Sequence, residues 1–215
     1  MAYLRWRRVL ELVSIDRPAL SPLLLRTGRK TPDAGANLTE TWDTVYEEGG
    51  YEHLSRSDQR HHHRLLAALI AEARPQARVL EVGCGEGVFY ESLRGHRPAA
   101  YLGVDVSPLA IDRARRSVTD PVATFSVGDG AAFQPPGEFD AIVFPECLEY
   151  LGEPSDVLAH YRRFLAPGGV FGVSMWMNAG SIALLRKLRA LETIRDQAVV
   201  LSQWGGGWTV VTIEG

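Results

Sequence analysis

Several features that would place this chain in a specialised class are absent or scarce. Its 215 residues contain no run of about 18 apolar residues, so we predict no membrane-spanning helix. Arginines interrupt the apolar positions at the N-terminus, which predicts no secretory signal. The only two cysteines, Cys84 and Cys147, indicate free thiols in a cytoplasmic protein. The formal charge of −3 gives no support to polyanion binding.

What is present indicates one globular domain with a substantial core, because 46% of the residues are hydrophobic and 23% are charged. Residues 1–38 differ from the rest as a basic N-terminal extension, with seven Arg or Lys between Met1 and Lys30. Apolar side chains at helical spacing predict a short amphipathic helix there. This helix would pack on the domain or a partner subunit, or attach to an anionic surface or a glycan-assembly complex.

Strands and helices alternate after residue 75. Strands are predicted near 77–82, 100–105, 122–127, 139–144, 168–174, 197–202 and 208–213, and helices near 58–74, 87–95, 108–117, 148–165 and 180–195. This alternation predicts an α/β fold whose parallel sheet is covered by helices on both faces. The last two strands are too close in sequence for an intervening helix, so they should form an antiparallel hairpin.

The most informative segment is Val79–Gly87, where a short apolar strand leads into glycine at every second position. Glycine lets the backbone turn sharply and approach a ligand closely. Glu81, near the end of the strand, should face the same opening, where a pyrophosphate would be a poor ligand. The third glycine comes two residues after the second, so the dinucleotide fingerprint Gly-x-Gly-x-x-Gly fails at Val88.

A second acidic residue, Asp105, ends the next predicted strand. A carboxylate about 20 residues after a glycine loop can accept hydrogen bonds from both hydroxyls of a ribose. Together with the turn Leu165–Gly169 and the terminal hairpin, these motifs resemble the class I S-adenosylmethionine-dependent methyltransferases of the small-molecule type. The resemblance covers about residues 40–215. It implies S-adenosylmethionine as cofactor and a seven-stranded, mostly parallel sheet with its seventh strand inserted in reverse.

The resemblance also implies a set of cofactor-binding residues. Asp129 would take the adenine amino group, although an ordinary turn aspartate is the alternative. A tyrosine-bearing segment before the glycine loop would fold over the cofactor, within a helical cap at 39–75 that precedes a core at 76–215. The alternative is that these tyrosines only pack within the cap. The cofactor-binding residues implied in this way are Tyr46, Tyr51, Glu81, Gly83, Cys84, Gly85, Asp105, Val106, Gly128, Asp129, Gly130 and Pro145.

The acceptor should enter at the end of strand 139–144. The Asn/Asp-Pro-Pro-Tyr motif of amino-methyltransferases is absent there, which argues against a DNA or RNA base as substrate. Some relatives carry Glu-x-x-Glu-His as a metal site, but here Tyr150 occupies the histidine position, so no metal is predicted. Glu146 would act as a base or hydrogen-bond partner. Glu149 is a second catalytic candidate or a helix N-terminal carboxylate, and His53 a third candidate at the acceptor.

The remaining histidines and the segment after strand 168–174 give weaker signals. His61, His62 and His63 are consecutive in a predicted helix and point about 100° apart, so we expect a solvated face rather than ligands of one ion. In the family, the region after this strand often lines the acceptor pocket, which makes Trp176, Met177 and Asn178 candidate substrate contacts. The helix that follows would pack on the core or form a homodimer contact.

The sequence therefore predicts a methyltransferase that acts on oxygen or nitrogen of a small-molecule acceptor, such as a sugar or glycan terminus or a natural-product scaffold. Methyl transfer is an in-line displacement, so alignment of the acceptor supplies much of the rate. One alternative is an RNA ribose methyltransferase that uses the basic extension. Another is a non-catalytic partner protein with the same fold, which the retained motif residues disfavour.

Overall fold

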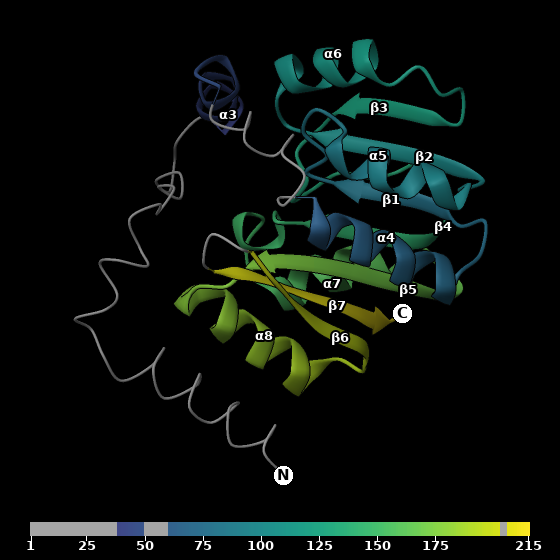
Figure 1. Ribbon diagram of the computed structural model, residues 1–215, viewed down its shortest axis with the longest axis vertical. Coiled ribbons are helices and arrows are strands. Elements are labelled where there is room, and N and C mark those ends of the chain that lie inside the picture. The colour runs from purple at the N-terminus through teal and green to yellow at the C-terminus, as the bar shows by residue number, and fades with distance from the viewer. Residues whose placement is uncertain (1–37, 50–59, 203–205) are drawn as a thin grey trace.

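The computed structural model describes residues 38–49, 60–202 and 206–215. Its centre is a single seven-stranded sheet in the order β3-β2-β1-β4-β5-β7-β6 (Figure 1). Strands β1 to β5 are parallel, and β7 runs antiparallel to both β5 and β6, as the sequence predicted. The strands are β1 (Arg78–Val82), β2 (Ala100–Asp105), β3 (Ala123–Val127), β4 (Phe139–Pro145), β5 (Leu165–Trp176), β6 (Ile194–Leu201) and β7 (Gly207–Glu214).

Helices connect these strands, and local sequence explains where several of them begin. The described helices are α3 (Leu38–Glu47), α4 (His61–Ala73), α5 (Val88–Leu93), η2 (Arg94–His96), α6 (Pro108–Ser117), η3 (Leu148–Tyr150), α7 (Pro154–Arg162) and α8 (Ala179–Leu191). Ser107 caps α6 by accepting from the Ala110 amide, with Pro108 in the first turn. The helix predicted at 148–165 is instead divided into η3 and α7, because Gly152 adopts a φ of +119° and Pro154 begins a new helix.

The sheet is buried on both faces, which confirms the predicted layers. Val79 packs in one apolar cluster with residues of α4, α5 and α6, and its neighbour Leu80 packs in the opposite cluster with residues of α7 and α8. This alternation follows from the two-residue period of a strand. In Figure 1, α4 and α5 lie in front of the sheet. No helix among the described residues is long and apolar enough to cross a membrane.

Within the segment predicted as one helical cap, 39–75, the described residues form two helices with different surroundings. Leu66 and Ile70 of α4 are fully buried against β5, where a Cβ on Gly172 would lie within 3.0 Å of both side chains. Helix α4 is therefore a core helix, whereas α3 contacts α6. The two helices differ in this way because α4 carries an apolar stripe, and packing on the sheet removes this stripe from water.

The strand order places a crevice where ligands bind in sheets of this kind. Strand β1 has β2 on one side and β4 on the other. The connections after β1 and β4 therefore leave toward opposite faces, and a crevice opens outside the carboxyl ends of these strands. The glycine loop follows β1, Asp105 is the last residue of β2, and Glu146 follows β4.

Candidate active site

A cleft of about 1140 Å³, part of it open to solvent, lies at the carboxyl ends of the central strands. Most of the sequence-predicted site residues come together in its wall: Tyr46, Glu81, Gly83, Cys84, Gly85, Asp105, Val106, Asp129, Gly130, Pro145 and Glu146.

The glycine loop needs its glycines for both conformation and space. Gly83 and Gly85 have φ values of +73° and +51°, which favour glycine. A Cβ on Gly83 would lie 2.6 Å from Cys147 Cβ, and a Cβ on Gly85 would lie 2.5 Å from the Tyr46 hydroxyl. The Gly83 and Cys84 amides both donate to the Val104 carbonyl, at 2.8 and 3.0 Å. The loop is thereby held against the end of β2.

Asp105 fixes the loop through its carboxylate. Its two oxygens accept hydrogen bonds from the Gly85 amide at 2.9 Å and the Ser107 amide at 3.0 Å. Burial raises the pKa of Asp105, and these backbone donors oppose the rise by stabilising the charged form. A carboxylate can accept about four hydrogen bonds, so acceptor capacity remains on Asp105 for a ligand.

Glu81 is a buried carboxyl group in the wall of the cleft. It is 2% exposed and accepts a hydrogen bond from the Tyr101 hydroxyl. Burial raises the pKa of Glu81 well above its ordinary range, against the effect of the Tyr101 hydrogen bond. Asp105 adds to the rise through charge repulsion. No described Lys or Arg lines the wall of the cleft. A cationic group of a ligand could therefore pair with Glu81, and its charge would lower the pKa of Glu81 again.

Helix α3 is attached to the core beside the glycine loop. The Asp43 carboxylate accepts hydrogen bonds from the Ser107 hydroxyl and the Leu109 amide at the N-terminus of α6, where a negative charge is favourable. Arg113 of α6 donates to the Tyr46 carbonyl at 3.1 Å and to Glu86 at 2.7 Å. These contacts hold the buried Tyr46 over Gly85.

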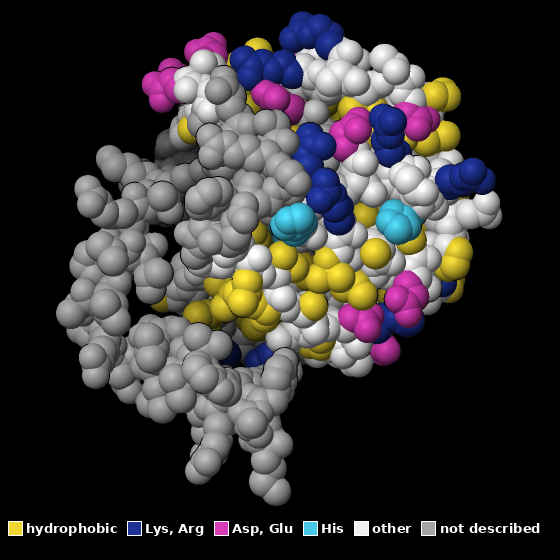
Figure 2. Space-filling model, in the orientation of Figure 1, with side chains coloured by type: hydrophobic (Ala, Val, Ile, Leu, Met, Phe, Trp, Pro, Cys, Tyr) yellow, Lys and Arg dark blue, Asp and Glu magenta, His cyan; other side chains and the backbone are white. Residues whose placement is uncertain are grey.

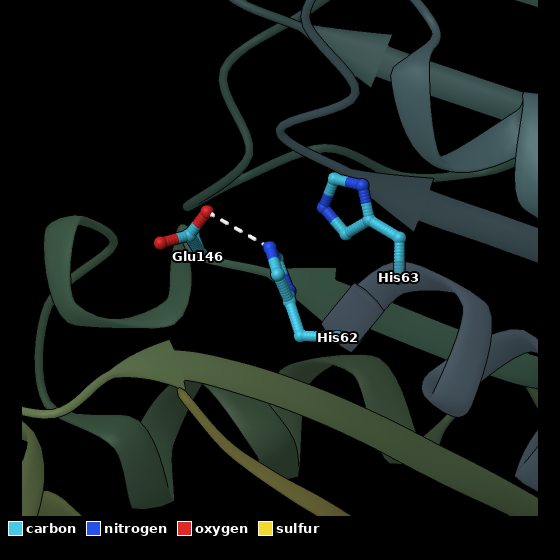
Figure 3. Close-up of side chains that lie close together, drawn as sticks. All are labelled: His62, His63 and Glu146. Atoms are coloured by element: carbon cyan, nitrogen blue, oxygen red, sulfur yellow. Dashed lines mark ion pairs between the residues drawn. The ribbon is translucent and has the colours of Figure 1, made fainter. Parts of the chain in front are cut away.

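Glu146, which follows β4 and lines the cleft, adopts a strained backbone conformation. Its φ is +54°, an uncommon value for a residue with a side chain and one that occurs often at functional sites. The Glu146 amide donates to the Ser174 carbonyl at 2.8 Å. One carboxylate oxygen accepts from Trp208 Nε1 at 2.9 Å, and the other lies 3.4 Å from His62 Nε2 (Figure 3). The side chain is 25% exposed.

The expectation of a solvated histidine face is wrong for two of the three residues. His61 is exposed, but His62 is 0% exposed and His63 only 5%. The His62 ring stacks on Trp208 at 4.6 Å, its Nδ1 lies 3.1 Å from Ser174 Oγ, and the ring centroids of His62 and His63 are 4.1 Å apart. Burial lowers the pKa of His63 to about 3, with a further contribution from the Arg60 charge. His63 is therefore neutral at pH 7.

A family model described as "Methyltransferase domain" matches residues 53–205, which is well over half of the chain. The chain belongs to this family. Membership confirms the resemblance to class I S-adenosylmethionine-dependent methyltransferases, which the sheet order supports independently.

Individual relatives of this methyltransferase domain align with it over only part of their own length. Nodulation protein S of Rhizobium tropici is 38% identical over 121 residues, which cover 54% of this chain and 50% of that protein. Ubiquinone biosynthesis O-methyltransferase of Thiobacillus denitrificans is 36% identical over 113 residues, with 50% and 48% covered. The chain thus spans about half the length of these curated relatives.

A solved structure shares the fold over a greater length. The N-methyltransferase NodS from Bradyrhizobium japonicum WM9, in complex with S-adenosyl-L-homocysteine, matches with a TM-score of 0.70 at 20% identity. The match covers 84% of this chain and 99% of that chain. At this identity the match establishes the shared fold of the methyltransferase domain.

Some predicted site residues of the methyltransferase domain do not line the cleft. Gly128 packs under Phe133, where a Cβ would approach to 2.6 Å, and Glu149 is absent from the wall. Trp176, Met177 and Asn178 also lie outside it: Asn178 caps α8, and Trp176 packs edge-on against Trp208. Tyr51 and His53 fall outside the described residues.

Several residues at the site had no sequence signal of their own. Trp42 and Tyr150 line the cleft with their rings edge-to-face at 5.4 Å, and His63 lines it from α4. On the face shown in Figure 2, basic and acidic side chains of the described residues are interspersed. Residues 1–37, on which the RNA alternative depended, lie outside the described part of the chain.

Proposed function

We propose that this chain transfers the methyl group of S-adenosylmethionine to an oxygen or nitrogen of a small-molecule acceptor. One observation carries the proposal: a single cleft joins the glycine loop to Glu81, Asp105 and Asp129. These groups match the successive parts of the cofactor, which has an amino-acid end with an ammonium group, a ribose and an adenine.

Each part of the cofactor has a chemically suitable partner in the cleft. The buried Glu81 carboxylate would pair with the ammonium group of the amino-acid end. Asp105 retains acceptor capacity for ribose hydroxyls. Asp129 forms a turn in which its side chain accepts from the Ala131 amide at 2.9 Å, and the apolar side chains of Val106 and Leu151 line the cleft with it. An adenine ring would be held between such apolar groups.

The acceptor would approach from the end at which Glu146 lies. In the reaction, a lone pair of the acceptor atom forms a bond to the methyl carbon while the bond from carbon to sulfur breaks. The acceptor proton then leaves to a base or to water. Glu146 lines the cleft and offers a carboxylate for this proton or for a hydrogen bond that orients the acceptor. The aromatic pair Trp42–Tyr150 contributes two rings to the cleft wall, against which an apolar part of the acceptor would pack.

The choice of acceptor atom stays open between oxygen and nitrogen. The relatives that match include one protein named as an O-methyltransferase and a structure named as an N-methyltransferase. A sugar or glycan terminus or a natural-product scaffold would offer hydroxyl or amino groups of suitable size, and we propose such an acceptor here.

The proposal is tested by titrating S-adenosylhomocysteine into the purified protein by calorimetry. We expect micromolar binding, and we expect Asp105→Ala to weaken it about 5- to 150-fold, because buried hydrogen bonds worth about 1–3 kcal/mol are lost. Asp112→Ala, which removes an exposed aspartate from α6, is the matched control and should bind as the wild type does. Absence of binding to the folded wild type would refute the proposal.

A further inference from the structure

Three potential metal ligands converge at the acceptor end of the cleft. His62 and His63 come from the first turn of α4, and Glu146 follows β4 (Figure 3). One ligand atom from each lies within 4.8 Å of the other two. This cluster is different from the Glu-x-x-Glu-His motif considered from the sequence, since Glu149 and Tyr150 take no part in it.

The spacing of two of these ligands already fits a bound ion. At ligand distances of about 2.0–2.1 Å in a tetrahedral site, two ligand atoms are about 3.3 Å apart. His62 Nε2 and Glu146 Oε2 are 3.4 Å apart. The ligand atom of His63 lies within 4.8 Å of the ligand atoms of His62 and Glu146, and rotation of the His63 side chain would bring it closer to them. Its Nδ1 is buried and has no hydrogen-bond partner among the described residues.

Surrounding groups orient two of the ligands in the way that metal sites require. Ser174 Oγ lies 3.1 Å from His62 Nδ1, and Trp208 Nε1 donates to the Glu146 oxygen that faces away from His62. If His62 carries its proton on Nδ1 and donates it to Ser174, the lone pair of Nε2 faces a carboxylate oxygen. A metal ion between these two acceptor atoms would accept electron pairs from both of them. Metal-binding histidines commonly donate a hydrogen bond from the N–H of their second ring nitrogen to a neighbouring oxygen.

We propose that His62, His63 and Glu146 bind one divalent transition-metal ion of the zinc type at the acceptor end of the cleft. Two imidazoles and one carboxylate suit zinc and its neighbours better than magnesium or calcium. Three protein ligands leave an open coordination position. Because His63 and Glu146 line the cleft, the open coordination position would face the cleft. Provided that the proposed function holds, the open position would take an oxygen of the acceptor.

The test uses the full chain, purified without a polyhistidine tag and stripped of metal with a chelator. Zinc is titrated by calorimetry, and cobalt is followed by the visible absorption of its tetrahedral complex. We expect one ion per chain with micromolar or tighter affinity. His63→Phe and Glu146→Gln should each weaken zinc binding at least about 10-fold. His61→Phe, a change at the exposed neighbour on the same helix, is the matched control and should leave affinity unchanged.

Two outcomes would overturn the proposal. Absence of stoichiometric binding would reduce the cluster to an ion pair between His62 and Glu146. An equal loss of affinity in His61→Phe would indicate chelation at the protein surface. Folding of every variant is verified by its thermal unfolding transition, and Glu146→Gln changes a partly exposed side chain, so it serves if His63→Phe does not fold. Zinc binding without S-adenosylhomocysteine binding would retain the metal site and refute the proposed function.

Discussion

The two parts of the cleft that we propose for the cofactor and for the acceptor, called here the cofactor end and the acceptor end, are built in different ways. At the cofactor end, the glycine loop follows β1 and Asp105 ends the neighbouring strand β2, and backbone amides make most of the contacts that fix them. At the acceptor end, side chains from four separate elements meet: His62 of α4, Glu146 after β4, Ser174 of β5 and Trp208 of β7.

This difference has an energetic consequence. The cofactor end depends on the conformations that glycine allows at two positions, so it should tolerate almost no added atom there. The acceptor end depends on the packing of side chains between α4 and β7, and a single side chain can be substituted there without a change in the glycine loop. We therefore expect changes at the first end to reduce cofactor affinity, and changes at the second to reduce stability while cofactor affinity is retained.

The largest effect is expected for Gly85→Val. The new side chain must adopt a φ of +51°, and its Cβ would lie 2.5 Å from the Tyr46 hydroxyl. We expect S-adenosylhomocysteine affinity to fall by at least about 100-fold, which corresponds to about 2.7 kcal/mol. Calorimetric titration measures this loss, and thermal unfolding shows that the variant is folded.

Gly95→Val is the matched control for this change. A Cβ on Gly95 would meet no atom within 4 Å, and its φ lies outside the left-handed region. Its affinity should equal that of the wild type. If Gly85→Val also kept normal affinity, the loop would not be the cofactor site, and the comparison between the two ends would fail.

A smaller effect, on stability, is expected for Trp208→Phe at the acceptor end. The change removes the indole N–H that donates to Glu146 and part of the ring that stacks on His62. We expect the free energy of unfolding in urea to fall by about 1–2 kcal/mol, since a hydrogen bond to a charged group is lost. S-adenosylhomocysteine affinity should not change.

Trp176→Phe provides the control for that measurement, because Trp176 contacts the Trp208 ring edge-on and takes no part in the hydrogen bond from Trp208 to Glu146. It should lose less stability than Trp208→Phe. A large fall in cofactor affinity in Trp208→Phe would show that the two ends are coupled.

Much of the fold and of the cofactor end could be predicted because their signals are local in sequence. The strand after residue 77, its glycine loop and the carboxylate of Asp105 lie within about 30 residues, as in a single strand–helix–strand unit. The length of β5 was underestimated, because its residues up to Trp176 pair with β7, a partner that the local sequence does not identify.

The acceptor end could not be predicted in the same way. A helical wheel gives the angle between His62 and His63 but does not say which faces of α4 are covered. In the structure α4 is covered on two sides, by Trp208 next to His62 and by Phe89 next to His63, so both imidazoles are buried. Their approach to Glu146 depends on a contact between residues more than 80 positions apart.

The smallest effect is expected for Asp43→Ala, which tests whether α3 belongs functionally to the cofactor end. The change removes the carboxylate that accepts from the Ser107 hydroxyl and the Leu109 amide. Because Tyr46 on the same helix covers Gly85, we expect calorimetry to show about a 5-fold loss of S-adenosylhomocysteine affinity, or about 1 kcal/mol. Glu47→Ala, at an exposed position of the same helix, should have no effect. Equal affinities in both variants would mean that α3 is only packed beside the cleft, and that the loop and the strand ends alone determine cofactor binding.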